Sequence, residues 1–197
     1  MVRKLIINEQ LSVDGVMQGP GQPDEDRSGG FEHGGWAMPY FDEVMGKAAG
    51  EGMGTAEGLL LGRKTYEIFA AYWPNQGDDV PFAGFLNSVP KYVASRTLRE
   101  PLEWNNSHLL KGDVADAVRS LKAEDGGDIM VLGSGDLAQT LMENDLIDVY
   151  DLWVDPIVLG TGKRLFREGN PKVELELVGS TTSSTGVSML TYRPAKS

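Results

Sequence analysis

Three short apolar runs in the chain each end at a turn residue, and helical patterns lie between them. Runs of this length bounded by turn residues are typical of buried strands. The runs are residues 59–61, 91–95 and 128–133. The helical patterns cover residues 64–71, 113–123 and 134–141. Strands that alternate with helices predict an α/β fold with a mostly parallel central sheet and helices on both faces.

The first part of the chain adds a strand, a loop and a helix. Residues 4–13 predict an opening strand that ends at the turn Asp14-Gly15. Residues 19–35 are rich in Gly, Pro, Asp and Glu, and we expect an irregular loop there. A helical stretch at 40–56 follows, weakened by four glycines.

The last part of the chain contains strands in succession. Residues 149–158 predict a long strand. Residues 173–178 alternate apolar and charged side chains, which predicts a strand with one solvated face. Residues 187–192 are its expected antiparallel partner. The sheet is therefore predicted to end in an antiparallel C-terminal strand pair.

Composition excludes several classes of function. The 197 residues carry a formal net charge of -11, so the surface repels nucleic acid and anionic membranes, and any anion site must be local. No apolar run reaches the roughly 18 residues of a membrane span. Cysteine is absent, which excludes disulfides and thiolate metal sites, and we expect no metal. We expect one domain over residues 1–197, in the cytoplasm.

Cations, hydroxyls and glycines gather where the three apolar runs end. In open α/β sheets, ligands bind beyond the carboxyl ends of the strands, where glycine lets the backbone approach an anion and helix N-termini attract it. The residues are Gly62, Arg63, Lys64 and Thr65 after the first run, Ser95 and Arg96 at the second, and Gly133, Ser134, Gly135 and Asp136 at the third. Each turn alone is better explained as a tight turn, a helix cap or a solvated loop than as an anion site. Together they predict a site for a pyrophosphate and a separate phosphate.

Four motifs in order resemble one known fold. They are LSVDGVM at 11–17, GLLLGRKTYE at 58–67, KYVASRT at 91–97, and DIMVLGSGD at 128–136 with PIVLGTG at 156–162. With them the chain resembles the dihydrofolate reductase fold. It is most similar to the branch that contains the C-terminal reductase domain of bifunctional riboflavin-biosynthesis deaminase-reductases. The resemblance runs nearly end to end. The zinc-site cysteines that a deaminase domain needs are missing from this chain.

The resemblance implies NADPH as the cofactor. By this resemblance Gly62, Arg63, Lys64 and Thr65 contact its phosphates, and Gly133, Ser134, Gly135 and Asp136 lie at its pyrophosphate. Ser95 and Arg96 select the 2'-phosphate. Val16 and Met17 lie beside the nicotinamide.

Hydride transfer to a C=N or C=O carbon also needs a proton for the neighbouring atom. Asp42 is our first candidate for this role, followed by Glu43 and Asp14. The alternative for Asp42 and Glu43 is that they begin a helix, where the helix dipole favours acids. We expect Asp155, which precedes Pro156, to be a strand-end turn residue.

Three aromatic residues near the same helix could line the pocket of a flat substrate, although aromatic residues are more often part of a core. They are Trp36, Tyr40 and Phe41. The predicted function is an NADPH-dependent reductase of a small heterocycle, of the 5-amino-6-(5-phosphoribosylamino)uracil reductase type. The alternatives are a dihydrofolate reductase and an NADP(H)-binding module without efficient catalysis. We expect a homodimer through the C-terminal strands.

Overall fold

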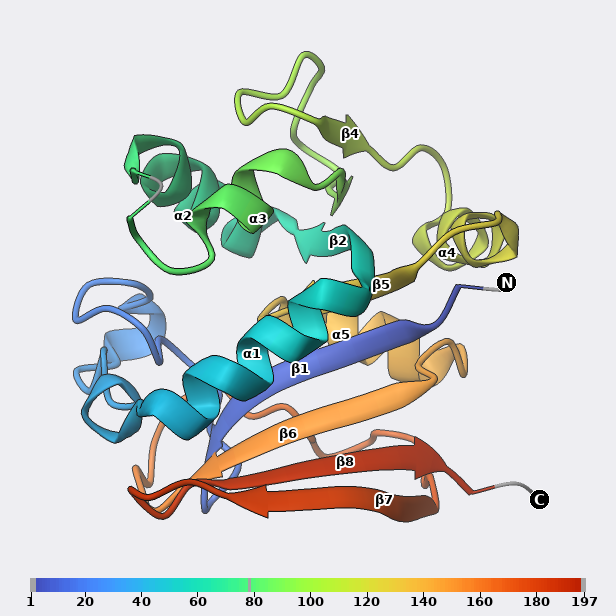
Figure 1. The fold of residues 1–197 in the computed structure, drawn as a ribbon. Helices are drawn as coiled ribbons and strands as arrows, with labels where there is room; N and C mark the ends of the chain where they lie inside the picture. Colours follow the sequence, from blue (N-terminus) through green and yellow to red (C-terminus); the bar gives the residue numbers. More distant parts are fainter. Residues whose placement is uncertain (1–2, 78, 196–197) are drawn as a thin grey trace.

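An eight-stranded sheet forms the centre of the fold (Figure 1). The computed structural model describes residues 3–77 and 79–195. The strands lie in the order β4-β3-β2-β5-β1-β6-β8-β7, parallel from β4 to β6, with β8 antiparallel to β6 and β7. Their bounds are β1 Leu5–Ser12, β2 Ala56–Gly62, β3 Lys91–Ala94, β4 Ser107–Leu109, β5 Asp128–Leu132, β6 Val149–Asp155, β7 Leu175–Thr182 and β8 Ser188–Pro194.

Helices cover both faces of this sheet. Those on one face are α4 and α5, and those on the other are α1, α2 and α3. Their bounds are α1 Glu43–Thr55, α2 Arg63–Tyr72, α3 Ala83–Ser88, α4 Val114–Ala123 and α5 Gly135–Glu143. Three short 3-10 segments are η1 Ser28–Gly30, η2 Met38–Tyr40 and η3 Trp73–Asn75.

The leucines of β2 explain why both faces are covered. Leu59, Leu60 and Leu61 are all fully buried, and neighbours along a strand point to opposite faces. Leu60 packs in one cluster with Val118 of α4 and Leu141 of α5. Leu59 and Leu61 pack in another cluster with residues of α2 and α3. A strand that is apolar on both sides therefore lies between two helical layers, as expected for a central parallel strand.

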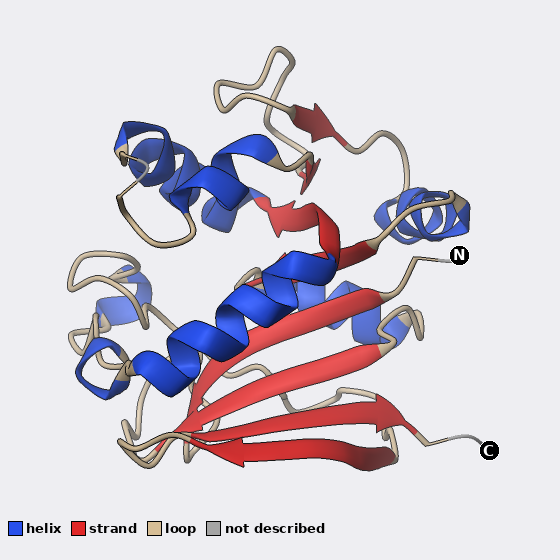
Figure 2. Ribbon diagram, in the orientation of Figure 1, coloured by secondary structure: helices blue, strands red, loops and turns tan. Residues whose placement is uncertain are grey.

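α1 crosses the sheet on the same side as α2 and α3 (Figure 2). Met45 is its buried residue and packs in a cluster with Trp153 and Met189. The helix contains four glycines, each of which lowers helix stability by about 1 kcal/mol relative to alanine. Asp42 caps its N-terminus by accepting a hydrogen bond from the backbone N–H of Met45.

The predicted fold class is confirmed, as is the antiparallel C-terminal strand pair. The loop predicted at 19–35 contains no strand, and one carboxamide organises it. Nε2 of Gln18 donates to the carbonyl oxygens of Asp26 and Ser28, and Nε1 of Trp36 donates to the carbonyl of Gln18. No helix in residues 3–77 or 79–195 is long and apolar enough to cross a bilayer.

Three expected boundaries were wrong, and one strand was not predicted. The helix expected from residue 40 begins at Glu43, because Asp42 has extended backbone angles and acts as its cap. β6 ends at Asp155 rather than at 158, before a proline that has no N–H to donate to a ladder. β7 continues past 178 into polar residues, since an edge strand needs no apolar pattern. The strand that was not predicted is β4, which is too short for its periodicity to be detected.

Candidate functional site

Two of the three predicted turns are bonded to each other. The backbone N–H of Gly62, at the end of β2, donates to Oγ of Ser134 over 2.9 Å. The N–H of Ser134 donates to Oγ1 of Thr65, at the start of α2, over 3.0 Å. The starts of α2 and α5 are thereby fixed side by side at one edge of the sheet.

The backbone of the turn after β5 is closely fitted to its neighbour. Gly133 and Ser134 both have positive φ, 54° and 64°. A Cβ added at Gly133 would lie 3.1 Å from Oγ1 of Thr65. Glycine is therefore needed at 133 for its conformation and for its close contact with α2.

Neither of the two helices at this turn has a side-chain cap. Oγ of Ser134 bonds Gly62 and the carbonyl of Leu132, so it does not cap α5, and Gly62 has no side chain to cap α2. By contrast, Asp42 caps α1 and Asp113 caps α4. Free N–H groups at a helix N-terminus, together with the helix dipole, favour an anionic ligand.

Cations surround these two helix starts. Arg63 and Lys64 are exposed in the first turn of α2. Arg63 pairs with Glu67 over 3.1 Å, whereas Lys64 makes no hydrogen bond or ion pair with the rest of the described chain. Nη1 of Arg167 lies 2.8 Å from Asp136, and its Nη2 lies 3.1 Å from where a Cβ on Gly135 would be. Sequence analysis did not identify Arg167, although the basic run GKRLFR at 162–167 was a signal for it.

The second predicted turn adjoins the first. Gly62 pairs with Ala94 across β2 and β3, so Ser95 follows directly beside the start of α2. Oγ of Ser95 accepts hydrogen bonds from the N–H groups of Thr97 and Leu98 and thereby shapes the turn. Arg96 is exposed and makes no hydrogen bond or ion pair within residues 3–77 and 79–195. All three turns therefore lie at the ends of the adjacent strands β3, β2 and β5.

Val16 and Met17 follow the end of β1 and differ in their surroundings. Val16 is fully buried and packs with Phe31 and Trp36 in a small core beneath the 19–35 loop. Met17 extends the other way, and its Sδ lies 3.0 Å from where a Cβ on Gly135 would be. Met17 therefore meets the turn at the start of α5, whereas the side chain of Val16 supports the loop.

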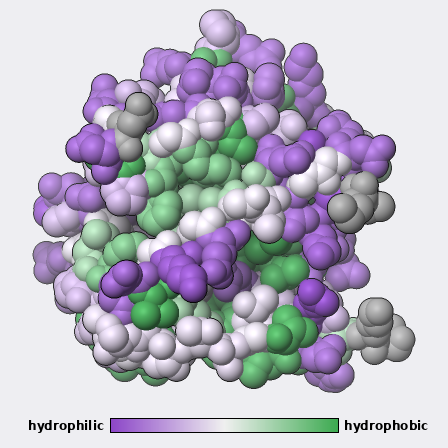
Figure 3. Space-filling view, viewed as in Figure 1, coloured by the Kyte–Doolittle hydropathy of each residue, from purple (hydrophilic) through white to green (hydrophobic). Residues whose placement is uncertain are grey.

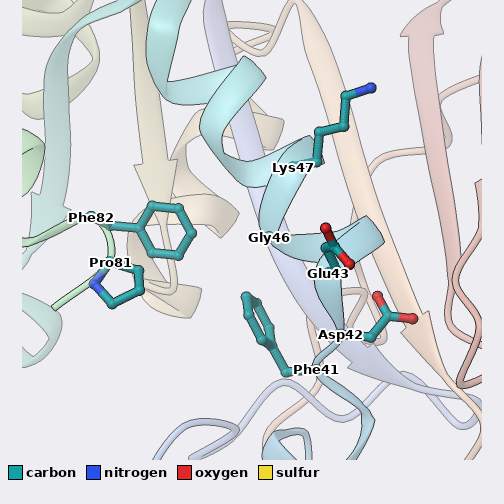
Figure 4. A pocket seen from close by; sticks show the side chains of 7 residues that line it. All are labelled: Phe41, Asp42, Glu43, Gly46, Lys47, Pro81 and Phe82. Atoms are coloured by element: carbon teal, nitrogen blue, oxygen red, sulfur yellow. The ribbon is translucent and has the colours of Figure 1, made fainter. Parts of the chain in front are cut away.

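A pocket opens between the start of α1 and the segment before α3. Its volume is about 560 Å³. Phe41 and Phe82 face each other across it (Figure 4). The lining residues are Phe41, Asp42, Glu43, Gly46, Lys47, Pro81 and Phe82. Hydrophobic surface lies between α1 and the layer of α2 and α3 (Figure 3). The pocket thus offers two aromatic walls with charged side chains at its rim.

Of the three aromatic residues expected at a substrate, only Phe41 lines this pocket. Trp36 is buried in the small core beneath the 19–35 loop. Tyr40 packs against the cluster that contains Met45 and Trp153. Both rings are held by apolar packing, the alternative that is more common for aromatic residues.

Asp42 and Asp14 are both held in the charged form. Asp42 accepts from Oγ and N–H of Ser184 at 2.6 and 2.7 Å and from the N–H of Met45 at 2.9 Å, and these bonds lower its pKa. Its carboxylate points away from Phe82 (Figure 4). Asp14 accepts from Oγ of Ser12 and from two backbone N–H groups, which hold its pKa well below the usual range.

These bonds argue against a proton-donating role for both acids. A carboxylate that is stabilised in its charged form is a poor acid at neutral pH. For Asp42 the contacts match the helix-cap alternative. Glu43 lies beside it on the pocket rim, exposed.

Two acids were not identified as buried from the sequence, and Asp155 was expected only as a strand-end turn residue. Asp155 is fully buried, neither carboxylate oxygen has a hydrogen-bond partner in the described chain, and burial raises its pKa to about 7. Glu9 is 4% exposed on the opposite face of the sheet, and burial raises its pKa well above the usual value. The alternation with Trp153 was the available signal for Asp155, because it indicates that the side chain points inward rather than into a turn.

Comparisons with known proteins agree with this geometry. The sequence model of the RibD C-terminal domain matches residues 3–189. The uncharacterized protein YyaP of Bacillus subtilis is 28% identical over 193 residues, which cover 96% of this chain and 94% of that protein.

Solved structures show the same fold. A protein of Shewanella sp. PV-4 assigned to riboflavin biosynthesis superposes with a TM-score of 0.70 at 24% identity, over 98% of this chain and 99% of that one. Dihydrofolate reductase from Enterococcus faecalis, in complex with NADP(H) and RAB-propyl, superposes with a TM-score of 0.62 at 14% identity, over 98% and 97%. The fold is thus that of dihydrofolate reductase, and the match over residues 3–189 shows that the chain belongs to the RibD C-terminal domain family.

Proposed function

We propose that this protein is an NADPH-dependent reductase of a small, flat heterocycle. The observation that carries the proposal is the bonded pair of turns at Gly62 and Ser134, where two uncapped helices begin side by side. Family membership supports a reductase, and the dihydrofolate reductase from Enterococcus faecalis binds NADP(H) on the same fold.

The donor groups at this edge fit the charges of NADPH. The N–H groups that begin α2 and α5 suit a pyrophosphate, and Lys64 is a cation without a partner in the described chain. Ser95 and Arg96, one strand further along, would hold the 2'-phosphate, and Met17 would lie beside the nicotinamide. The bound cofactor supplies a hydride.

The distribution of charge in the protein supports an anionic ligand at this edge of the sheet. The protein has a net charge of -11, yet Arg63, Lys64 and Arg96 lie on the turns at this edge and Arg167 pairs with Asp136 beside them. Two of the four have no acidic partner in the described part of the chain. An acidic protein that leaves cations unpaired beside free N–H groups is suited to a polyanionic cofactor.

The pocket supports a flat substrate. Phe41 and Phe82 face each other at its walls, and aromatic side chains stack favourably on planar rings. We propose an aminopyrimidine of the 5-amino-6-(5-phosphoribosylamino)uracil type, for which Lys47, which also pairs with Glu51 over 3.9 Å, is the cation at the pocket rim. Dihydrofolate is the second candidate, since its pteridine ring presents a similar flat surface.

One observation favours a non-catalytic alternative. Asp42 and Asp14, two of the three acids expected to serve the chemistry, are both occupied by structural hydrogen bonds. A cofactor-binding module without efficient turnover would need no further acid. NADPH affinity without reduction of any acceptor would favour this alternative.

Calorimetric titration with NADPH and then NADH tests the proposal. We expect a preference for NADPH of about tenfold or more, since one lost charge-assisted contact is worth about 1.5–3 kcal/mol. Arg96→Ala should remove the preference, whereas the control Arg119→Ala removes the same charge from α4 and should leave it intact. Absence of binding by either nucleotide would refute the cofactor assignment. NADPH oxidation with dihydrofolate, 6-methyl-7,8-dihydropterin or 5-amino-6-(5-phosphoribosylamino)uracil then identifies the acceptor.

A further inference from the structure

Arg167 is held against the first turn of α5 by a network of hydrogen bonds. Its backbone N–H donates to Oδ1 of Asn170, and Nδ2 of Asn170 donates to Oε1 of Gln139 over 2.6 Å. Gln139, one turn into α5, donates in turn to the carbonyls of Gly135 and Leu165 over 3.1 and 2.9 Å. The segment around Arg167 is thereby attached to the N-terminal end of the helix.

The guanidinium of Arg167 lies over the first residue of α5. Its Nη2 is 3.1 Å from where a Cβ on Gly135 would be, and Sδ of Met17 is 3.0 Å from the same point. A side chain at 135 would crowd both groups, so the glycine leaves room for them. Arg167 and Met17 therefore approach the helix start together, where the pyrophosphate of the proposed cofactor would lead to its nicotinamide.

A cation at this position is unfavourable unless an anion joins it. The N-terminus of a helix carries a partial positive charge, so cations are stabilised at the opposite end. No side chain caps α5, and the first N–H groups of a helix have no partner within it. In the described chain, the anion that pairs with Arg167 is Asp136, 2.8 Å from Nη1. Because the side chain of Asp136 is 93% exposed, this ion pair contributes little to stability.

We propose that Arg167 exchanges partners when the cofactor binds, leaving Asp136 and forming a charge-assisted hydrogen bond to the pyrophosphate. The inference rests on the proposed function. A pyrophosphate accepts hydrogen bonds from the free N–H groups of α5 and from the guanidinium together. Asp136 is then a competitor of the cofactor for Arg167, and its carboxylate lowers the affinity of the site.

The alternative is that the ion pair is structural. Asp136 lies in the first turn of α5, where the helix dipole favours an acid, and Arg167 would then only tie its segment to the helix. The amides of Gln139 and Asn170 already make that attachment without the guanidinium. Nε of Arg167 donates to the carbonyl of Arg164 over 3.2 Å, which leaves Nη1 and Nη2 for an anion once Asp136 is released. The two explanations predict opposite effects of replacing Asp136.

A double-mutant cycle of Arg167→Gln and Asp136→Asn, measured by calorimetric titration with NADPH and with NADH, tests the exchange. Arg167→Gln should weaken the binding of both nucleotides about tenfold, since it removes a charge-assisted hydrogen bond to a group that they share. The preference for NADPH over NADH should therefore stay as in the wild type. Asp136→Asn should tighten the binding of both about threefold, as expected for the loss of an exposed ion pair. It should give no gain when Arg167 is already replaced.

Arg119→Gln and Asp116→Asn are the matched controls. Arg119 and Asp116 form an exposed ion pair of 2.7 Å on α4. Nη2 of Arg119 also bonds Asn144, which follows the last residue of α5. The two substitutions therefore make the same changes of charge near the other end of the same helix. Nucleotide affinity should stay within about twofold, because salt screens exposed charges at such a distance.

Weaker binding in both single variants would show that the ion pair is structural and would overturn the exchange. So would an unchanged affinity in Arg167→Gln, a loss of the NADPH preference in that variant, or an equal gain from Asp136→Asn with and without Arg167. If Arg167→Gln does not fold, Asp136→Asn alone decides, because an unchanged or weaker affinity there also overturns the exchange. Failure of the wild type to bind either nucleotide would instead refute the proposed function, and the exchange with it.

Discussion

The backbone N–H of Gly62 donates a 2.9 Å hydrogen bond to Oγ of Ser134, 72 positions further along the chain. A second bond, from the N–H of Ser134 to Thr65, closes the pair. The two bonds fix the relative position of two helix starts that would both have to contact one pyrophosphate. Pre-organised donors of this kind bind more tightly because their ordering takes place during folding rather than on binding.

Ser134→Ala should destabilise the protein and weaken NADPH binding together. The substitution removes the acceptor for Gly62 and the donor to Leu132, at a cost of about 1–2 kcal/mol in the free energy of unfolding. Ser134→Gly loses the same hydrogen bonds, but it relieves backbone strain, because a side chain is unfavourable at a φ of 64°. We therefore expect it to be less destabilising than Ser134→Ala. Urea denaturation measures both variants. If Ser134→Gly were the less stable of the two, backbone strain at this turn would be excluded.

The position of the turn residues at one edge of the sheet could be predicted because it depends on local sequence. Gly62 and Gly133 each end an apolar run, and the glycine, the cations and the hydroxyl are adjacent in the chain. A strand followed by a helix brings such residues to one sheet edge without knowledge of the rest of the fold. The Ser134 bond to Gly62, however, could not be predicted, because it depends on β2 and β5 being neighbours.

Residues whose roles depend on distant neighbours were predicted poorly. The environment of Asp155 is set by Ser12 and Val187, which reach it only through the pairing of β1 and β8 with β6. Trp36 was expected at a substrate, but its ring packs with Phe31 beneath a loop whose shape no sequence period describes. Local propensity does not predict which apolar residues a long loop will cover.

Asp42→Asn should lower thermal stability while preserving most of any turnover. The amide keeps an acceptor oxygen for the N–H of Met45. It loses the negative charge that stabilises the start of α1 and strengthens the hydrogen bonds from Ser184. Differential scanning fluorimetry and steady-state kinetics measure the two effects. Ser184→Ala is the matched control, since it removes a donor to the same carboxylate from outside the helix. A complete loss of turnover in Asp42→Asn, but not in Ser184→Ala, would restore Asp42 as the catalytic acid.

Gly50→Ala should stabilise the protein. Gly50 lies inside α1, and a Cβ there would have no atom within 4 Å, so the gain in helix propensity of about 1 kcal/mol is not offset by a clash. Gly133→Ala is the contrasting variant, because its positive φ and the 3.1 Å approach to Thr65 make a Cβ unfavourable. The free energy of unfolding from chemical denaturation should therefore rise in Gly50→Ala and fall in Gly133→Ala. A loss of stability in Gly50→Ala would show that α1 is shaped by more than its own propensity.

Leu177→Lys should convert a homodimer into a monomer. β7 is the outer strand of the sheet, and its exposed Leu177 and Val178 lie on an edge that a second copy could cover. Size-exclusion chromatography with light scattering should give the mass of a dimer for the wild type and of a monomer for the variant. A wild-type mass of 21.4 kDa, that of one chain, would refute the expected homodimer.

The stability of the wild type should fall as pH rises through the range set by Asp155. The pKa of this group is 3.8 in the unfolded chain and about 7 in the fold, so between these values the folded state holds a proton that the unfolded state has released. The free energy of unfolding therefore decreases from about pH 4 to about pH 7, and above that the contribution is constant. Asp155→Asn removes this contribution and should be more stable than the wild type at pH 8, with a smaller difference at pH 4. Urea denaturation across this range measures it. A less stable Asp155→Asn at pH 8 would mean that the buried carboxylate has a structural partner.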